Sequence, residues 1–200
     1  DRGRTDWKIV VGRQASPSEV YAGRELQHFL KEITGVEMPI IGDAGPVGPN
    51  EILVGPSDRL AQRGVQVDWS RLGDEGFVIR TLDDALVIAG GKARGTLYGV
   101  YTFLEDVLGC RWFTPDVSRI PKRETIVIER LDIEQIPVLE YREPYFFTSF
   151  NGDWAARNKM NGNFLRLEER HGGKIDYSSL FVHTFDHFVP VERFFDSHPE

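Results

Sequence analysis

The sequence predicts an α+β fold in which helices pack on one face of a β-sheet. Residues 77–81 carry side chains at strand spacing, and after a turn of two aspartates residues 85–89 form a continuous apolar run. Together they indicate a β-hairpin. Residues 93–108 then place apolar side chains at helical spacing, and Gly109 lies where a left-handed C-cap belongs. A hairpin followed by a helix that folds back on it is the centre of an α+β layer.

Further strands and a second helix are predicted before the hairpin. Residues 8–12 read as a short strand, and Ser16 followed by proline is typical of a helix start. Apolar residues at helical spacing follow, and Gly35 closes this predicted helix. Residues 39–50 are rich in proline and glycine and are predicted to form a loop. Residues 51–55 read as the second strand of the sheet.

The first domain is predicted to end shortly after a last strand. Residues 56–74 are polar and irregular, with one helical turn expected at 58–62, and residues 125–129 alternate cleanly as a strand does. The resulting order is β-α-β-β-β-α-β. Because the pattern breaks within residues 132–137, we predict a domain at residues 1–133, close to the commonest domain size.

Residues 134–200 are predicted to begin a second domain. Strand signals occur at residues 138–142, 163–167 and 181–185, with a short polar helix at 155–160. Phenylalanines gather in this part of the chain. It is too short for a large core of its own, so we interpret it as the first portion of a second domain.

Composition limits the possible functions. The 200 residues carry a net charge of −7, which argues against a general nucleic-acid binder. No apolar run approaches the length of a membrane-spanning helix. The single cysteine, Cys110, is expected to be a buried structural thiol. The chain begins at Asp1, and a removed signal peptide would suit a secreted or periplasmic protein, although a fragment would begin in the same way.

The glycine-rich turn at residues 90–96 joins a strand to a helix, but it does not have the spacing of a phosphate-binding loop. We interpret its glycines as serving a tight turn and close helix packing. Arg94 opens the helix and is expected to pair with a carboxylate or to brace a domain contact. His183 and His187 lack further metal ligands nearby, so we expect neither a metal nor a cofactor.

Polar residues lie among exposed-type aromatics after residue 137, an arrangement that suits sugars. Hydroxyls can hydrogen-bond to arginines, carboxylates and amides while a sugar ring stacks on an aromatic face. The alternative is that the aromatics form a core and the charged residues form its solvated rim. Composition alone favours this second interpretation.

Residues 76–116 resemble the N-terminal accessory domain shared by family 20 β-N-acetylhexosaminidases, α-glucuronidases and related bacterial hydrolases. The resemblance lies in an R-G-x-x-Y-G-x-x-x-x-L-E helix, matched by Arg94, Gly95, Tyr98, Gly99, Leu104 and Glu105. Residues 23–40 are similar to the first helix of that domain. The strongest likeness is to DUF4838-type proteins, in which this domain precedes a (β/α)₈ barrel. The resemblance implies a β-hexosaminidase domain 2-like sheet with two helices on one face, followed by the truncated start of such a barrel at residues 134–200.

The resemblance also implies a function. The accessory domain is non-catalytic in such hydrolases, and two carboxylates at the ends of barrel strands act on a carbohydrate substrate. An arginine ending the first barrel strand binds sugar hydroxyls in family 20, which implies that Arg142 contacts the substrate. His183 is the next candidate, followed by Asn158 and Asp153. The paired Asp-Glu motif of family 20 is absent, so no catalytic residue is assigned here.

The resemblance makes this chain the N-terminal fragment of a carbohydrate-active hydrolase, with the remainder of the catalytic barrel as its partner. Two alternatives stay open. One is a non-catalytic module that binds carbohydrate or another protein. The other is a polysaccharide lyase, in which Arg142 and His183 would neutralise and deprotonate a uronate.

Overall fold

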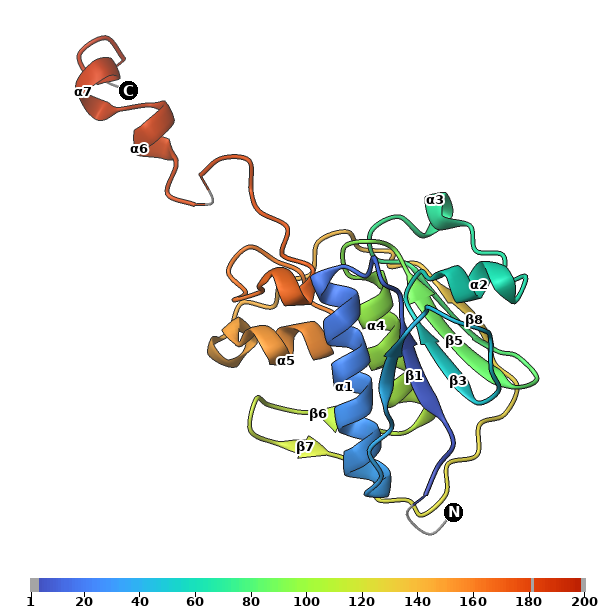
Figure 1. The fold of residues 1–200 in the computed structure, drawn as a ribbon. Coiled ribbons are helices and arrows are strands. Elements are labelled where there is room, and N and C mark those ends of the chain that lie inside the picture. Colours follow the sequence, from blue (N-terminus) through green and yellow to red (C-terminus); the bar gives the residue numbers. More distant parts are fainter. Residues whose placement is uncertain (1–3, 181, 199–200) are drawn as a thin grey trace.

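A computed structural model describes residues 4–180 and 182–198, which form a mixed α+β structure around one mostly parallel sheet (Figure 1). The sheet has the strand order β2-β1-β3-β5-β4-β8. The first four strands in this order are mutually parallel, whereas β4 is antiparallel to both β5 and β8. The strands are β1 Lys8–Val11, β2 Ile40–Gly42, β3 Glu51–Val54, β4 Phe77–Thr81, β5 Ala85–Gly90 and β8 Asp132–Gln135.

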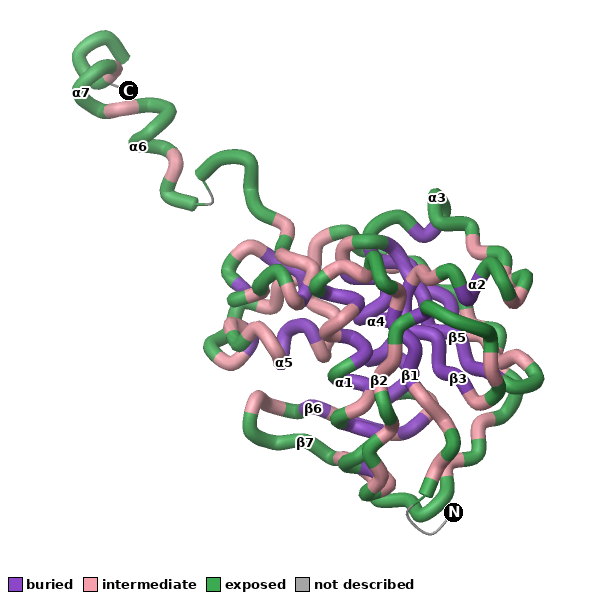
Figure 2. Tube along the Cα trace, viewed as in Figure 1, coloured by how far each residue is buried: buried purple, intermediate pink, exposed green. Residues whose placement is uncertain are grey.

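The hairpin predicted at the centre of the chain is confirmed. Strands β4 and β5 pair with Ile79 opposite Ile88, and every residue of β5 is buried. The strand β3 beside it is also buried throughout. Continuous apolar runs such as these are typical of strands that are covered on both faces. The tube view shows the buried residues gathered around β1, β3, β5 and the helix that follows β5, α4 Gly95–Thr102 (Figure 2).

Two long helical segments cover one face of the sheet, as predicted. Helix α1, Pro17–Thr34, begins with a capping box between Ser16 and Glu19, and Gly35 ends it in the left-handed conformation. Helix α4, Gly95–Thr102, continues into a π-helical segment, η1 Phe103–Val107. Both pack on the core that contains the side chains of Ile9, Val54, Ile79 and Ile88.

Shorter elements cover the opposite face (Figure 1). The short helices α2, Asp58–Gln62, and α3, Trp69–Leu72, contribute Leu60 and Leu72 to a second, smaller core. That core also contains Val10, Leu53, Val78 and Val87, which alternate along their strands with the residues of the first core. The helical turn expected at 58–62 is therefore confirmed.

The sequence prediction is wrong about two segments near the edges of the sheet. Residues 125–129 do not form a strand. Ile126 and Ile128 are half-buried against the end of the core, while Val127 between them is 81% exposed. The last strand is instead β8, which follows Leu131 and pairs with β4. The predicted loop at 39–50 also contributes β2, because its first residues pair with β1. Strand formation here depends on a neighbouring backbone more than on side-chain pattern.

The part of the chain after β5 and α4 contains a small hairpin and several short helices. Strands β6, Arg111–Trp112, and β7, Ser118–Arg119, form a separate two-stranded sheet. The helical elements that follow are η2 Phe147–Phe150, α5 Gly152–Arg157, η3 Glu169–His171, α6 Phe185–Phe188 and α7 Val191–Phe194. The last two extend away from the rest of the molecule and are exposed (Figures 1 and 2).

The strands predicted in the C-terminal part are not formed. Residues 138–142, 163–167 and 182–184 have no strand conformation, and Phe185 begins helix α6, while residue 181 lies outside the described residues. A strand requires hydrogen bonds to a neighbouring strand, and within the described ranges none pairs with these segments. Apolar spacing alone therefore predicted strands that this chain does not complete.

The glycine-rich turn between β5 and α4 has the structural role that its sequence suggested. A Cβ atom on Gly91 would overlap the carbonyl oxygen of Gly73, and one on Gly95 would overlap the carbonyl oxygen of Gly76. Three backbone segments therefore approach so closely here that side chains are excluded.

We predict that Gly91→Ala destabilises the protein by more than about 2 kcal/mol, because the added methyl group must displace backbone atoms. Gly42→Ala is the matched control, since the nearest atom to its added Cβ is 4.0 Å away in the flexible Arg13 side chain. Urea denaturation of both variants gives the comparison. Equal midpoints for the two variants would contradict the assigned packing role of Gly91.

Candidate functional site

The side chain of Arg142 lies at the contact between the C-terminal part of the chain and the sheet. Its Nη2 atom donates to Oε2 of Glu75 at 2.6 Å, and its Nε atom donates to the carbonyl oxygen of Lys159 at 2.8 Å. The guanidinium also lies 5.7 Å from the centre of the Tyr98 ring. Arg142 thus holds two parts of the chain together.

The carboxylate of Glu75 is the centre of this contact. Glu75 precedes β4 and is only 8% exposed. It accepts hydrogen bonds from Nε of Arg94 at 2.7 Å, from Arg142, and from Nδ2 of Asn161 at 2.8 Å. A buried carboxylate needs such partners, since each of them replaces hydration lost on burial. The carboxylate pairing predicted for Arg94 is therefore confirmed. Arg94 also donates to the carbonyl oxygen of Gly172 at 2.9 Å, in the C-terminal part of the chain.

Two more ion pairs join the same parts of the chain. Glu25 on α1 accepts from Nε of Arg157 at 3.0 Å and from the hydroxyl of Tyr101 at 3.0 Å. Glu105 accepts from Nζ of Lys159 at 2.6 Å. All three glutamates precede β8 and all three cations follow it. We call this arrangement the polar seam, formed by Glu25, Glu75 and Glu105 on one side and Arg142, Arg157 and Lys159 on the other.

Asp153, in the first turn of α5, belongs to a neighbouring cluster. Its Oδ1 atom lies 2.8 Å from Nε2 of His171, 3.1 Å from the hydroxyl of Tyr21 and 3.0 Å from Nη1 of Arg170. Nδ1 of His171 accepts the backbone N–H of Glu168 at 2.9 Å, which places the ring proton on Nε2 facing Asp153. Both ring nitrogens of this buried histidine are therefore engaged in structure, and neither is available as a general base.

The remaining predicted site residues are separated. Asn158 caps the C-terminal end of α5, where its Nδ2 atom donates to the carbonyl oxygens of Trp154 at 2.9 Å and Trp112 at 3.4 Å. His183 is exposed in the segment just before α6. Figure 1 shows α6 extending away from the part of the molecule that contains α5. The structure therefore gathers Arg142, Asp153 and Asn158 around α5 and leaves His183 apart.

A cavity of about 560 Å³ opens at the N-terminal end of α5. Its walls come from the turn between β6 and β7 and from the segments around η2 and η3. Asp153 was predicted as a site residue, whereas Asp116 and Arg166 were not singled out because nothing in their local sequence marks them. Side chains that line it include Asp116, Phe147, Asp153, Arg166, Glu168 and Arg170.

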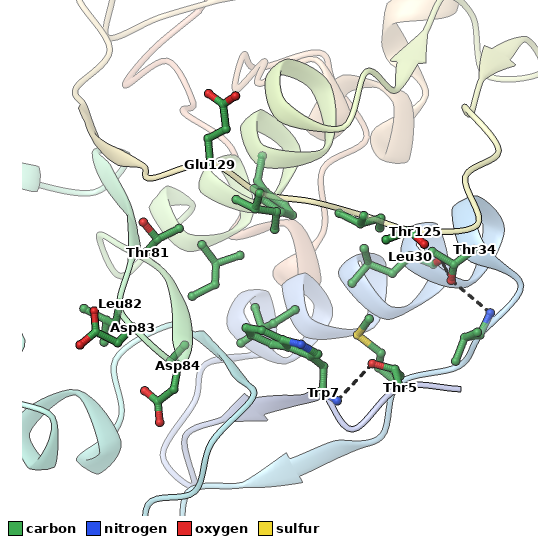
Figure 3. A pocket seen from close by; sticks show the side chains of 18 of the residues that line it. Thr5, Trp7, Leu30, Thr34, Thr81, Leu82, Asp83, Asp84, Thr125 and Glu129 are labelled. Atoms are coloured by element: carbon green, nitrogen blue, oxygen red, sulfur yellow. Dashed lines mark hydrogen bonds between the residues drawn. The ribbon is translucent and has the colours of Figure 1, made fainter. Parts of the chain in front are cut away.

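A larger cavity of about 1160 Å³ lies at the end of the sheet that contains the β4–β5 turn, beside residues 124–130. Figure 3 shows the indole of Trp7 lying across it, with Asp83 and Asp84 at one side and Leu30 and Thr34 at the other. Its floor is apolar, formed by side chains packed on the main core. None of the predicted site residues lines it, so we place the candidate site at α5.

The described residues give little support for a metal site, a membrane span or a reactive thiol. Within residues 4–180 and 182–198, no group of three or more His, Cys, Asp or Glu side chains is placed to hold a metal ion. No described helix is long and apolar enough to cross a bilayer. Burial raises the pKa of Cys110 to about 11, so this thiol is protonated and unreactive near neutral pH. The expectation of a buried structural cysteine is confirmed.

We predict that Glu75→Gln destabilises the protein by about 3 kcal/mol, because two arginines lose their carboxylate partner in a buried place. Glu37→Gln is the matched control, since Glu37 pairs with Lys31 on the exposed surface and the loss should stay below about 1 kcal/mol. Urea denaturation measures both. Similar losses for the two variants would show that the polar seam contributes no more than a surface ion pair.

We predict that acid weakens the contact of α5 through Asp153. Burial alone would raise the pKa of its carboxyl, but the hydrogen bonds from His171 and Tyr21 and the charge of Arg170 hold that pKa below its usual value. The contribution of Asp153 is therefore complete above the unfolded-state pKa of about 3.9 and is lost as pH falls through its lower folded-state pKa. The midpoint of thermal unfolding should fall less steeply between pH 7 and pH 3 for Asp153→Asn than for the wild type. Parallel pH profiles would exclude this linkage.

Comparison with known protein families finds matches for both parts of the chain. A family model described as glycosyl hydrolase family 67 N-terminus matches residues 4–103, and the domain of unknown function DUF4838 matches residues 112–200. No curated protein matches the chain.

Among solved structures, the family 20 β-N-acetylhexosaminidase of Streptomyces coelicolor A3(2) is similar, at 20% identity and a TM-score of 0.51, over 78% of this chain and 29% of that one. A family GH115 4-O-methyl-α-glucuronidase with specificity for decorated arabinogalactans aligns at 20% identity and a TM-score of 0.47, over 70% of this chain and 19% of that one. A GH138 enzyme targeting pectin rhamnogalacturonan II aligns at 16% identity and a TM-score of 0.43, over 78% and 18%.

At 20% identity the hexosaminidase shows a shared fold alone. The chain spans at most 29% of the length of these solved structures. The match to the family 67 model is stronger evidence, since it covers half of the sequence. From residue 4 to residue 103 the chain belongs to the glycosyl hydrolase family 67 N-terminus family, and a DUF4838 region follows it.

Proposed function

We propose that residues 1–133 form a non-catalytic accessory domain of a glycoside hydrolase, and that residues 134–200 begin its catalytic (β/α)₈ barrel. The observation that carries this proposal is the polar seam, in which the first part of the chain binds the second through Glu25, Glu75 and Glu105. In this proposal the accessory domain holds the start of the barrel in place. The last strand of the sheet, β8, runs to Gln135, two residues beyond this boundary, so we propose that the junction lies just after that strand.

Family and fold support an action on carbohydrate. The match to the family 67 N-terminus covers α1, the sheet strands up to β5 and α4. The fold is similar to part of a β-N-acetylhexosaminidase. A fold can carry unrelated functions, so the substrate class is inferred here from family membership, and the site's chemistry must be tested directly.

Exposed apolar side chains support a further part of the barrel. Val138 is 97% exposed, Phe185 85% and Leu139 66%. Such side chains occur scattered on any surface, but here they gather after residue 137, where predicted barrel strands lack partners. A complete barrel needs about 250 residues. In the proposal, the rest of the barrel supplies the missing strands and covers these side chains.

The four predicted substrate contacts enter the proposal in different ways. Asp153 lines the cavity at α5 and is proposed to face the sugar. Arg142 and Asn158 are engaged with Glu75 and with backbone carbonyls, so their proposed contribution is to position the loops around them. His183 is proposed to reach the substrate once the segment before α6 packs against the rest of the barrel. The catalytic carboxylates are proposed to lie on later barrel strands.

A non-catalytic carbohydrate-binding module is the second candidate. The cavity at α5 favours it, because carboxylates, guanidiniums and an exposed phenyl ring surround one opening without a placed general acid. Such a module would bind sugars and leave the glycosidic bond intact.

We expect hydrolysis of glycosides by the full-length protein and none by this 200-residue chain. The test measures release of chromophore from a panel of aryl uronides and aryl N-acetylhexosaminides, with both proteins at equal concentration. Hydrolysis by the full-length protein alone supports an accessory role. Sugar binding by both proteins with hydrolysis by neither supports the module, and hydrolysis by this chain alone would overturn the accessory assignment.

A further inference from the structure

We propose that the cavity at the N-terminal end of α5 is a binding subsite for one uncharged sugar residue, with Phe147 as its stacking platform and Asp116 and Arg166 as its hydrogen-bonding partners. The proposal rests on the proposed action on carbohydrate and names a place and a ligand class for it. The cavity volume of about 560 Å³ lies in the range of ordinary small-molecule sites.

The phenyl ring of Phe147 gives the cavity an apolar wall. Phe147 lines the opening and is 88% exposed, in contrast to Phe150, which lines the same cavity and packs edge-on against Tyr145. Covering an exposed phenyl ring with the apolar face of a sugar ring removes both surfaces from water, which stabilises the complex.

Two polar groups on the walls are available to a ligand. Within the described residues, neither the carboxylate of Asp116 nor the guanidinium of Arg166 is engaged by another side chain. A carboxylate accepts hydrogen bonds and a guanidinium donates them. A hydroxyl does both, so a sugar residue can satisfy the two groups together where a purely anionic or cationic ligand satisfies one.

The charge of the walls favours an uncharged sugar over an acidic one. Three carboxylates, from Asp116, Asp153 and Glu168, face two guanidiniums, from Arg166 and Arg170. Arg170 is already committed, because it pairs with Asp153 at 3.0 Å and with Glu168 at 2.9 Å. The carboxylate of a uronate would meet an excess of negative charge, and like charges disfavour binding.

The subsite joins both parts of the chain. Asp116 belongs to the turn between β6 and β7, whereas Phe147 and Arg166 follow β8. The indole Nε1 of Trp154 donates to the carbonyl oxygen of Trp112 at 2.9 Å, which fixes α5 beside the β6–β7 hairpin. The part proposed as an accessory domain therefore contributes directly to the ligand contact.

The test is titration of the 200-residue chain with the neutral disaccharides cellobiose, xylobiose, mannobiose and lactose, and with digalacturonate, followed by NMR or calorimetry. We expect at least one neutral disaccharide to bind, and digalacturonate to bind more weakly. Phe147→Ala and Arg166→Ala should each weaken binding about ten-fold. Both side chains are exposed, so the thermal midpoint should remain that of the wild type.

Phe113→Ala and Arg119→Ala are the matched controls, since both residues are exposed and neither lines the cavity. Their affinities should equal that of the wild type. The proposal is wrong if no neutral disaccharide binds, if digalacturonate binds more tightly, or if the controls lose as much affinity as the cavity variants. Loss of the neutral-sugar site in the full-length protein would also overturn it, because the rest of the barrel would then cover Phe147.

This binding measurement is independent of hydrolysis. A full-length protein that cleaves no glycoside while the cavity still binds a disaccharide would reject the proposed hydrolase and retain the subsite. Hydrolysis without any effect of Phe147→Ala on binding would reject the subsite and retain the hydrolase.

Discussion

The burial of one carboxylate, that of Glu75, is the constraint on which the arrangement of the molecule depends. Glu75 precedes a central strand, and its partners Arg94, Arg142 and Asn161 come from three separate places in the sequence. A carboxylate that is 8% exposed is stable only when charged or polar donors replace its water. The hydrogen bonds to this carboxylate therefore hold the start of α4 and the segments on either side of α5 in place at the same time.

The signs of the charges make this contact selective. The glutamates of the polar seam all precede β8, and the arginines and lysine all follow it. A shifted contact would leave buried charges unpaired, at a greater cost than the net gain from any one correct pair. The tight glycine turn acts on the same contact, because Gly91 and Gly95 bring three backbone segments together next to Arg94. Close packing and paired charge thus orient the same helix end.

The seam also explains why a cavity forms at α5. With Arg157 and Lys159 bound on one side, the first turn of α5 lies beside Tyr21 and the hairpin that contains Trp112. The cavity is therefore bounded by elements from both parts of the chain. A part of the molecule that carries no catalytic group of its own can in this way influence how a ligand is held.

The sequence by itself determined the elements whose signals are local: helix α1 with its Ser16 cap, the β4–β5 hairpin, α4 and the glycine turn. These follow from spacing and capping within a few residues. Only the tertiary structure decided that residues 40–42 and 132–135 are strands and residues 125–129 are not, because a strand needs a neighbouring backbone. It also decided that Arg142 binds Glu75, 67 residues away, and that Asp116 and Arg166 share a cavity. Partners so distant in the chain leave no local pattern, since only folding brings them within hydrogen-bonding distance.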